Sequence, residues 1–207
     1  YMYFARFVHR FMETLHIERA HFTGHSLGGG MMLKLALTHP EKISKLVLVG
    51  SSGLGRAISP SLRLLSLPLI GEKLSQPSPK GIARLYKQMV YDKSLITADK
   101  VELGYQINAR PRAQRTFLAT ARNMMNLLGM KPAQYKPIRT QLHKVKAPVL
   151  VLWGQQDRMV PVKHARVAEE NIPDVSVKRF DKCGHLPMIE HPEAFNQEVV
   201  QFLEDSP

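Results

Sequence analysis

Five residues near the start of the chain, Gly24-His25-Ser26-Leu27-Gly28, fit the spacing G-x-S-x-G. They lie between a predicted strand over residues 20–23 and a predicted helix over residues 31–38. A strand that turns abruptly into a helix strains its central residue, and side chains two positions to either side would collide. The turn exposes the Ser26 hydroxyl and leaves the Leu27 N–H at a helix N-terminus, where it can donate to an oxyanion. The spacing predicts a nucleophilic serine with Leu27 in its oxyanion hole; the alternative is a glycine loop that only begins a helix.

A serine hydroxyl is a weak nucleophile until a base removes its proton, and the chain has nine histidines. Only His185 directly follows a predicted strand, residues 175–180, and Gly184 before it allows a close approach. His185 is therefore the predicted base. The other histidines have different expected places. His9, His16 and His164 belong to predicted helices, and His143 belongs to the central segment. His39 and His191 precede a proline at a helix boundary, and His21 and His25 are too close to Ser26 in the chain to turn back on it.

An acid must hold the histidine in the correct tautomer. Asp157 follows the predicted strand over residues 147–153 through a short loop, so it lies, like His185, in a loop at the carboxyl end of a strand. The competing carboxylates are Asp181, which is expected to cap its loop, and Asp174, which is expected to belong to a turn. Asp157 is therefore the predicted acid.

The elements that must position these residues alternate along the chain. The strands are predicted over residues 20–23, 45–49, 147–153 and 175–180, and the helices over residues 3–16, 31–38, 162–170 and 192–204. Strands alternating with helices indicate a mainly parallel α/β sheet. Loops at the carboxyl ends of such strands meet at one edge, where ligands and catalytic groups gather.

The central segment, residues 56–146, has a different pattern. Helical periods cover residues 61–70, 80–91, 99–108 and 111–128, and no strand is expected there. We therefore predict three parts: a core with the serine turn over residues 1–55, a helical cap over residues 56–146, and a core with the acid and the histidine over residues 147–207. A cap inserted between two strands is expected to cover the site.

The net charge of +12 is unevenly distributed. The segment 56–146 has 17 Lys and Arg against four Asp and Glu, a balance of +13, and the rest of the chain has −1. Because the excess is confined to one block, we expect no nucleic-acid partner. The cap is either a solvated helical face or a surface with weak attraction to anionic membranes, since apolar residues 62–70 lie close to Arg63 and Lys73.

Several classes of protein are disfavoured by composition. The longest apolar runs, residues 147–154 and 64–70, are shorter than the roughly 18 residues that a membrane-spanning helix needs. The single cysteine, Cys183, excludes an intramolecular disulfide and any multi-cysteine metal site. No metal or cofactor is expected.

The predicted chain order Ser26, Asp157, His185 resembles that of the α/β-hydrolase family. The resemblance implies a serine hydrolase that cleaves small carboxylic esters through an acyl-enzyme, like esterases and lipases. The cap also resembles that of carbon-carbon bond hydrolases that act on ring-cleavage products, which is the alternative enzyme. A ligand receptor without catalysis remains a third interpretation, because the fold serves that purpose too.

The resemblance also suggests that part of the family's fold lies upstream. In the family, several strands precede the serine turn, and a loop after the third strand supplies the second oxyanion donor. The predicted strand over residues 20–23 would be the family's fifth. We therefore expect the second half of the family's sheet, an N-terminally incomplete chain, and impaired activity in the isolated piece.

Overall fold

A computed structural model of the protein describes residues 1–205. In these residues, a single parallel sheet has the strand order β1-β2-β5-β6. Its members are β1 (Ala20–His25), β2 (Ile43–Val49), β5 (Val149–Gly154) and β6 (Val175–Phe180). The inner strands β2 and β5 are almost entirely buried because helices cover both of their faces. The predicted parallel α/β sheet is confirmed.

The register of the sheet brings its strand ends to one edge. His25 is paired with Val49, Val49 with Leu152, and Gly154 with Phe180. The loops that follow β1, β2, β5 and β6 therefore leave from the same edge. All three residues of the predicted catalytic set lie in or beside these loops.

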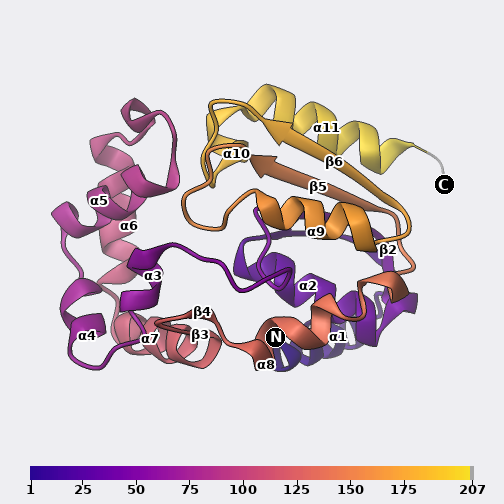
Figure 1. Ribbon diagram of the computed structural model, residues 1–207, viewed down its shortest axis with the longest axis horizontal. Helices are drawn as coiled ribbons and strands as arrows, with labels where there is room; N and C mark the ends of the chain where they lie inside the picture. Colours follow the sequence, from indigo (N-terminus) through magenta and orange to yellow (C-terminus); the bar gives the residue numbers. More distant parts are fainter. Residues whose placement is uncertain (206–207) are drawn as a thin grey trace.

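Helices pack on both faces of the sheet, as Figure 1 shows. Alternate side chains of β2 and β5 point to opposite faces: Leu48 and Val151 join the core beneath α1 (Met2–Thr14), α2 (Leu27–Thr38) and α9 (Lys163–Asn171). Their neighbours Val49 and Leu152 face the short α10 (Pro187–Glu190) and the long α11 (Pro192–Glu204). A 3₁₀ turn, Pro40–Lys42, joins α2 to β2.

The segment between β2 and β5 is mainly helical. It contains α3 (Pro60–Leu64), α4 (Ile70–Leu74), α5 (Pro79–Met89), α6 (Ala98–Asn108), α7 (Ala113–Met124) and α8 (Pro132–Arg139), with 3₁₀ turns at Lys93–Leu95 and Leu142–Lys144. Figure 1 shows α3 to α7 gathered at the left of the sheet, whereas α8 returns to pack on α2. Within residues 1–205, every helix is too short or too polar to cross a membrane.

Two helices predicted in the cap differ from the observed ones. The predicted helix over residues 61–70 is interrupted, because Pro68 lacks the N–H that a continuous helix needs and Leu69 has a φ of +66°. The predicted helix over residues 111–128 ends at Met124. The chain then forms a small hairpin from β3 (Met125–Asn126) and β4 (Gly129–Met130), so the expectation that the cap contains no strand is wrong.

One further helix and one further helix boundary differ from the prediction. Helix α8 was missed because two prolines, Pro132 and Pro137, lie within its eight residues and obscure the helical pattern. Helix α2 begins at Leu27 rather than at residue 31, although the glycines at positions 28–30 are poor helix formers. Close packing of this helix against the segment after β2 explains the small residues at Gly29 and Gly30.

Candidate active site

Ser26 occupies a strained turn between β1 and α2. Its backbone has φ 52° and ψ −118°, and its N–H donates to the Val49 carbonyl at 2.8 Å. A Cβ on Gly24 would lie 2.7 Å from the backbone of Gly28, so Gly24 must lack a side chain, as predicted. A Cβ on Gly28 would meet nothing within 4 Å, so the same expectation is wrong for Gly28. The turn leaves Ser26 partly exposed at the sheet edge.

His185 and Asp157 form a buried hydrogen-bonded pair. The two atoms that meet are His185 Nδ1 and Asp157 Oδ2, 2.7 Å apart, and the side chains are 3% and 0% exposed. The second oxygen of Asp157 accepts from the N–H groups of Met159 and Val160 at 2.8 and 3.0 Å. The carboxylate is therefore fixed by its own loop and can hold Nδ1–H of the imidazole, which leaves Nε2 to exchange a proton.

Gly50 is the place where the serine turn meets this pair. It follows β2 with a φ of +50°, and it directly follows Val49, whose carbonyl holds the Ser26 N–H. A Cβ on Gly50 would lie 3.0 Å from His185 Nδ1 and 3.4 Å from Asp157 Oδ2. Sequence reasoning missed this residue, although a glycine directly after a buried strand was a signal for it.

The three predicted residues thus lie in loops that follow strands at one edge of the sheet. Across residues 1–205, the Ser26 hydroxyl makes no hydrogen bond to His185. Such bonds are often long until a substrate is bound, and a hydroxyl can rotate. Leu27 is the first residue of α2, and the first N–H groups of a helix have no acceptor inside it. The arrangement can therefore supply a nucleophile, a base, an orienting acid and one oxyanion donor.

His25 supports the histidine loop from the other side. Its Nε2 lies 2.9 Å from the His185 carbonyl, and the two rings are 4.6 Å apart. Burial, and then the neighbouring His185, lowers the pKa of His25 to about 4. A neutral His25 must carry its proton on Nε2 to donate to that carbonyl. Apart from the position of His25 beside Ser26, no signal in the sequence predicts this contact.

The competing residues lie elsewhere. Asp181 is exposed and accepts from Gln156 Nε2 at 2.9 Å, a bond that lowers its pKa. His39 and His191 lie at the helix boundaries where they were expected, but in the described residues neither makes a side-chain cap hydrogen bond. Instead, His39 stacks on His9 and His191 stacks on Phe180.

One group of side chains in the described residues has the composition of a metal site. Ligand atoms of His9, His39 and Glu41 lie within 4.8 Å of one another. The two imidazole rings stack 3.7 Å apart with planes only 20° from parallel, so their nitrogen lone pairs do not converge on one point. This group lies at the C-terminal end of α2, whereas Ser26 lies at the N-terminal end. It contributes nothing to the strand edge.

Comparisons with known proteins agree with the fold. The model of the alpha/beta hydrolase fold family matches residues 1–192. A "2-hydroxy-6-oxononadienedioate/2-hydroxy-6-oxononatrienedioate hydrolase" of Comamonas testosteroni is 32% identical over 200 residues, which cover 96% of this chain and 68% of that protein.

Solved structures give the same result. A meta-cleavage product hydrolase from Pseudomonas fluorescens IP01 superposes with a TM-score of 0.77 at 25% identity, covering 93% of this chain and 67% of that one. A membrane phospholipase A, described as a bacterial virulence factor, superposes with a TM-score of 0.76 at 28% identity, covering 97% and 61%. The family model, the relative and the superpositions lead to one assignment: the chain belongs to the alpha/beta hydrolase fold family.

Proposed function

We propose that this protein hydrolyses a carbon-carbon bond in a 2-hydroxy-6-oxo-dienoate, through an acyl-enzyme on Ser26. The observation that carries the proposal is the match to the Comamonas testosteroni hydrolase over 96% of the chain, a span that must include most of the helical segment between β2 and β5. The family resemblance of the sequence implied carboxylic esters as the substrates. The relatives favour the carbon-carbon bond, which the same three residues can cleave.

The chemistry follows from the structure of such a substrate. A ketone at C6 is conjugated to a dienol that ends at C2 beside a carboxylate. Moving the enol proton from oxygen to C5 gives a 2,6-dioxo acid, in which the electron pair of a broken C5–C6 bond is delocalised onto the C2 carbonyl. Attack at C6 then forms an acyl-enzyme and releases a dienolate. Water cleaves the acyl-enzyme, so one water is consumed and two acids are formed.

The geometry suggests a role for each residue. His185 Nε2 removes the proton of the Ser26 hydroxyl as its oxygen adds to C6, and the imidazolium returns that proton to the departing dienolate. Asp157 holds Nδ1–H and stabilises the imidazolium. The Leu27 N–H donates to the oxyanion at C6. In the second half-reaction, His185 removes a proton from water and returns it to Ser26.

Hydrolysis of carboxylic esters is the second candidate. The observation that favours it is the 28% identity with a membrane phospholipase A over 97% of this chain. Both reactions form an acyl-enzyme on Ser26. They differ in the leaving group, because an alkoxide departs directly, whereas a carbon leaving group needs the preceding proton shift to C5.

The test is a comparison of substrates on the same preparation. Loss of the dienol absorbance reports cleavage of a 2-hydroxy-6-oxo-dienoate, and release of p-nitrophenolate reports cleavage of a short aryl ester. We expect a larger kcat/KM for the dienoate. Turnover of the ester without cleavage of the dienoate would favour the second candidate, and turnover of neither substrate would favour a ligand receptor.

The matched variants are Ser26→Ala and Ser176→Ala. Ser176 is exposed on β6, so its loss is expected to leave both activities at the wild-type level. Ser26→Ala is expected to abolish turnover and labelling by a fluorophosphonate. Labelling that survives in Ser26→Ala would place the nucleophile elsewhere.

A further inference from the structure

The cap and the histidine loop meet backbone to backbone. Helix α5 ends at Met89, and the Met89 carbonyl accepts from the His185 N–H at 2.6 Å. A Cβ on Gly184 would lie 2.5 Å from the Met89 carbonyl oxygen and 2.9 Å from Val90 Cα. The glycine before the histidine is therefore required by the approach of the cap, and not only by the turn of its own loop.

One carboxylate spans this junction. Glu190 is the last residue of α10, the short helix that begins two residues after His185. Its Oε1 accepts from the Gly184 N–H at 2.7 Å. Its Oε2 accepts from the N–H groups of Tyr91 and Asp92, at 2.5 and 3.4 Å, in the segment directly after α5. A single side chain thus satisfies backbone donors of both the loop and the cap.

The chemistry of these bonds requires a carboxylate. Hydrogen bonds from an N–H to a charged oxygen are about twice as strong as those between neutral groups. An amide at this position would keep one acceptor oxygen and turn an NH₂ group toward the other N–H, so it could hold only one of the two segments. Glu190 can hold both because its two oxygens are equivalent acceptors.

His185 is consequently restrained from three directions. His25 lies against its carbonyl, Met89 accepts from its N–H, and Glu190 holds the preceding residue. Two of these three restraints come from, or connect to, the cap. The orientation of the imidazole against Asp157 therefore depends on how the cap is seated, and not only on the sheet.

We propose that Glu190 is a positioning residue that couples the seating of the cap to the orientation of His185. The cap must be docked through residues 89–92 for the imidazole to activate Ser26. The coupling rests on the proposed role of His185 as the base. It does not depend on whether the substrate is a dienoate or an ester.

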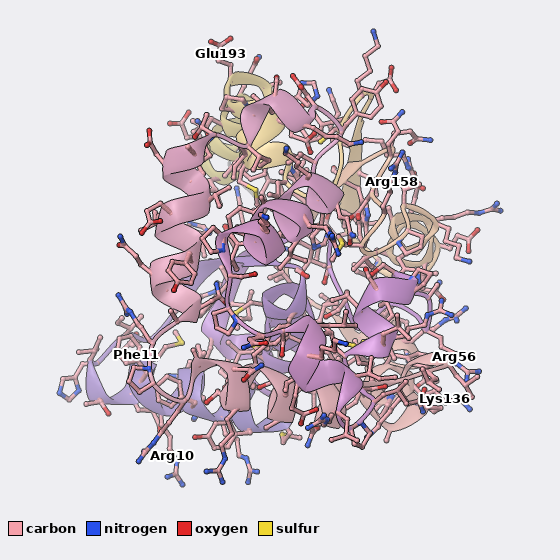
Figure 2. All side chains as sticks on the ribbon, turned by 90° about the vertical axis from the view of Figure 1, so that its left-hand side faces the viewer. Arg10, Phe11, Arg56, Lys136, Arg158 and Glu193 are labelled. Atoms are coloured by element: carbon pink, nitrogen blue, oxygen red, sulfur yellow. The ribbon has the colours of Figure 1, made fainter. Side chains whose placement is uncertain are left out.

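The test uses Glu190→Gln with Glu193→Gln as the matched control. Glu193 is three residues further on, is exposed, and points outward from α11 in Figure 2. The first readout is the rate at which a fluorophosphonate labels Ser26, because this rate needs the serine and the histidine but not the natural substrate. We expect it to fall about 10- to 100-fold in Glu190→Gln and to stay at the wild-type level in Glu193→Gln.

A second readout separates positioning from folding. Glu190→Gln is expected to lower kcat by a similar factor while KM changes less than about twofold, and the low-field NMR signal of His185 Nδ1–H should broaden. Glu190→Asp keeps the charge and is expected to recover part of the labelling rate. Unchanged labelling and an unchanged NMR signal in a folded Glu190→Gln would overturn the proposal.

A third measurement needs no substitution. If one carboxylate holds both segments, the amide hydrogens of Gly184 and Tyr91 open together and should show matching protection in hydrogen exchange. Protection at Gly184 with rapid exchange at Tyr91 would also overturn the proposal. By contrast, a wild-type protein that is labelled normally but leaves the dienoate intact contradicts only the proposed function.

Discussion

The two oxygens of Asp157 have separate partners. Oδ1 accepts from two N–H groups of its own loop, and Oδ2 faces His185 Nδ1. Two neutral imidazoles lie near this pair. Burial lowers the pKa of His164 to about 4, with smaller effects of Lys163 and Arg139, and His25 is lowered to a similar value. Both of these imidazoles therefore stay uncharged at neutral pH.

Replacing Asp157 by Asn should preserve the loop but not the imidazole. The amide oxygen can still accept from Met159 and Val160, whereas its NH₂ faces Nδ1 and favours the wrong tautomer. We expect kcat to fall by about 10⁴ with KM little changed, measured by steady-state kinetics. Asp181→Asn is the control. Greater damage from Asp181→Asn would show that the acid has been assigned to the wrong residue.

The buried histidines make stability depend on pH. Between the ordinary histidine pKa of 6.5 and the lowered value of about 4, the unfolded chain binds protons that the folded chain does not. The free energy of unfolding should therefore decrease as the pH falls through this window. His164→Gln should reduce that decrease, measured by urea unfolding at several pH values, and exposed His143→Gln should not. A decrease that is equal in all three proteins would contradict the role of His164.

At the scale of elements, the start of α2 is fixed by contacts that its sequence does not reveal. A Cβ on Gly30 would lie 2.5 Å from the Tyr1 ring and 2.8 Å from Ser52 Oγ, and these two residues share a hydrogen bond of 2.7 Å. At Gly28, two residues earlier on the same helix, there is open space. The glycines of one helix thus have different reasons for being there.

This difference predicts opposite effects on stability. Gly30→Ala should break the Tyr1–Ser52 contact and destabilise the protein by about 1–3 kcal/mol, because overpacking forces its neighbours to move. Gly28→Ala should be neutral or stabilising by up to about 1 kcal/mol, since alanine favours a helix. Denaturant unfolding of the two variants measures both values. Equal destabilisation by the two changes would contradict the packing described for Gly30.

The strand and helix pattern was predictable where local signals decide structure. Strand β6 and helix α11 have the predicted bounds, because alternation marks the first and Pro192 begins the second. The serine turn and the loops of Asp157 and His185 were found because each follows a predicted strand. The contribution of Glu190 was not predictable, since its partner Tyr91 is 99 residues away in the chain and is met only in the folded structure.

At the scale of the whole molecule, charge and apolar surface coincide on the cap. Figure 2 shows Arg56 and Lys136 pointing outward from it. Leu69, directly before the short helix α4, is 83% exposed, and Lys73 lies on α4 itself. A basic surface with exposed leucine side chains is typical of contact with anionic lipid headgroups.

The corresponding prediction concerns vesicles. The protein should sediment with phosphatidylserine vesicles more than with phosphatidylcholine vesicles. Added salt should weaken this binding, because screening limits the reach of exposed charges to about 8 Å at physiological ionic strength. Reversing the charges of Arg63 and Lys73 should reduce the difference in binding between the two kinds of vesicle. Leu69→Ser should also reduce it, whereas Leu103→Ser on α6 is the control. Equal binding to both vesicles at low salt would leave a solvated face as the only interpretation.

The junction between Met89 and Gly184 also limits how such enzymes can be recombined. Consider a chimera in which the helical segment between β2 and β5 is replaced by that of a related protein. Here the transplanted segment would have to present a carbonyl to the His185 N–H and two amide hydrogens to Glu190. A donor segment that differs in length or direction at residues 89–92 should fold on its host and yet leave the imidazole misaligned, so grafting needs both sides of this contact to be transferred together.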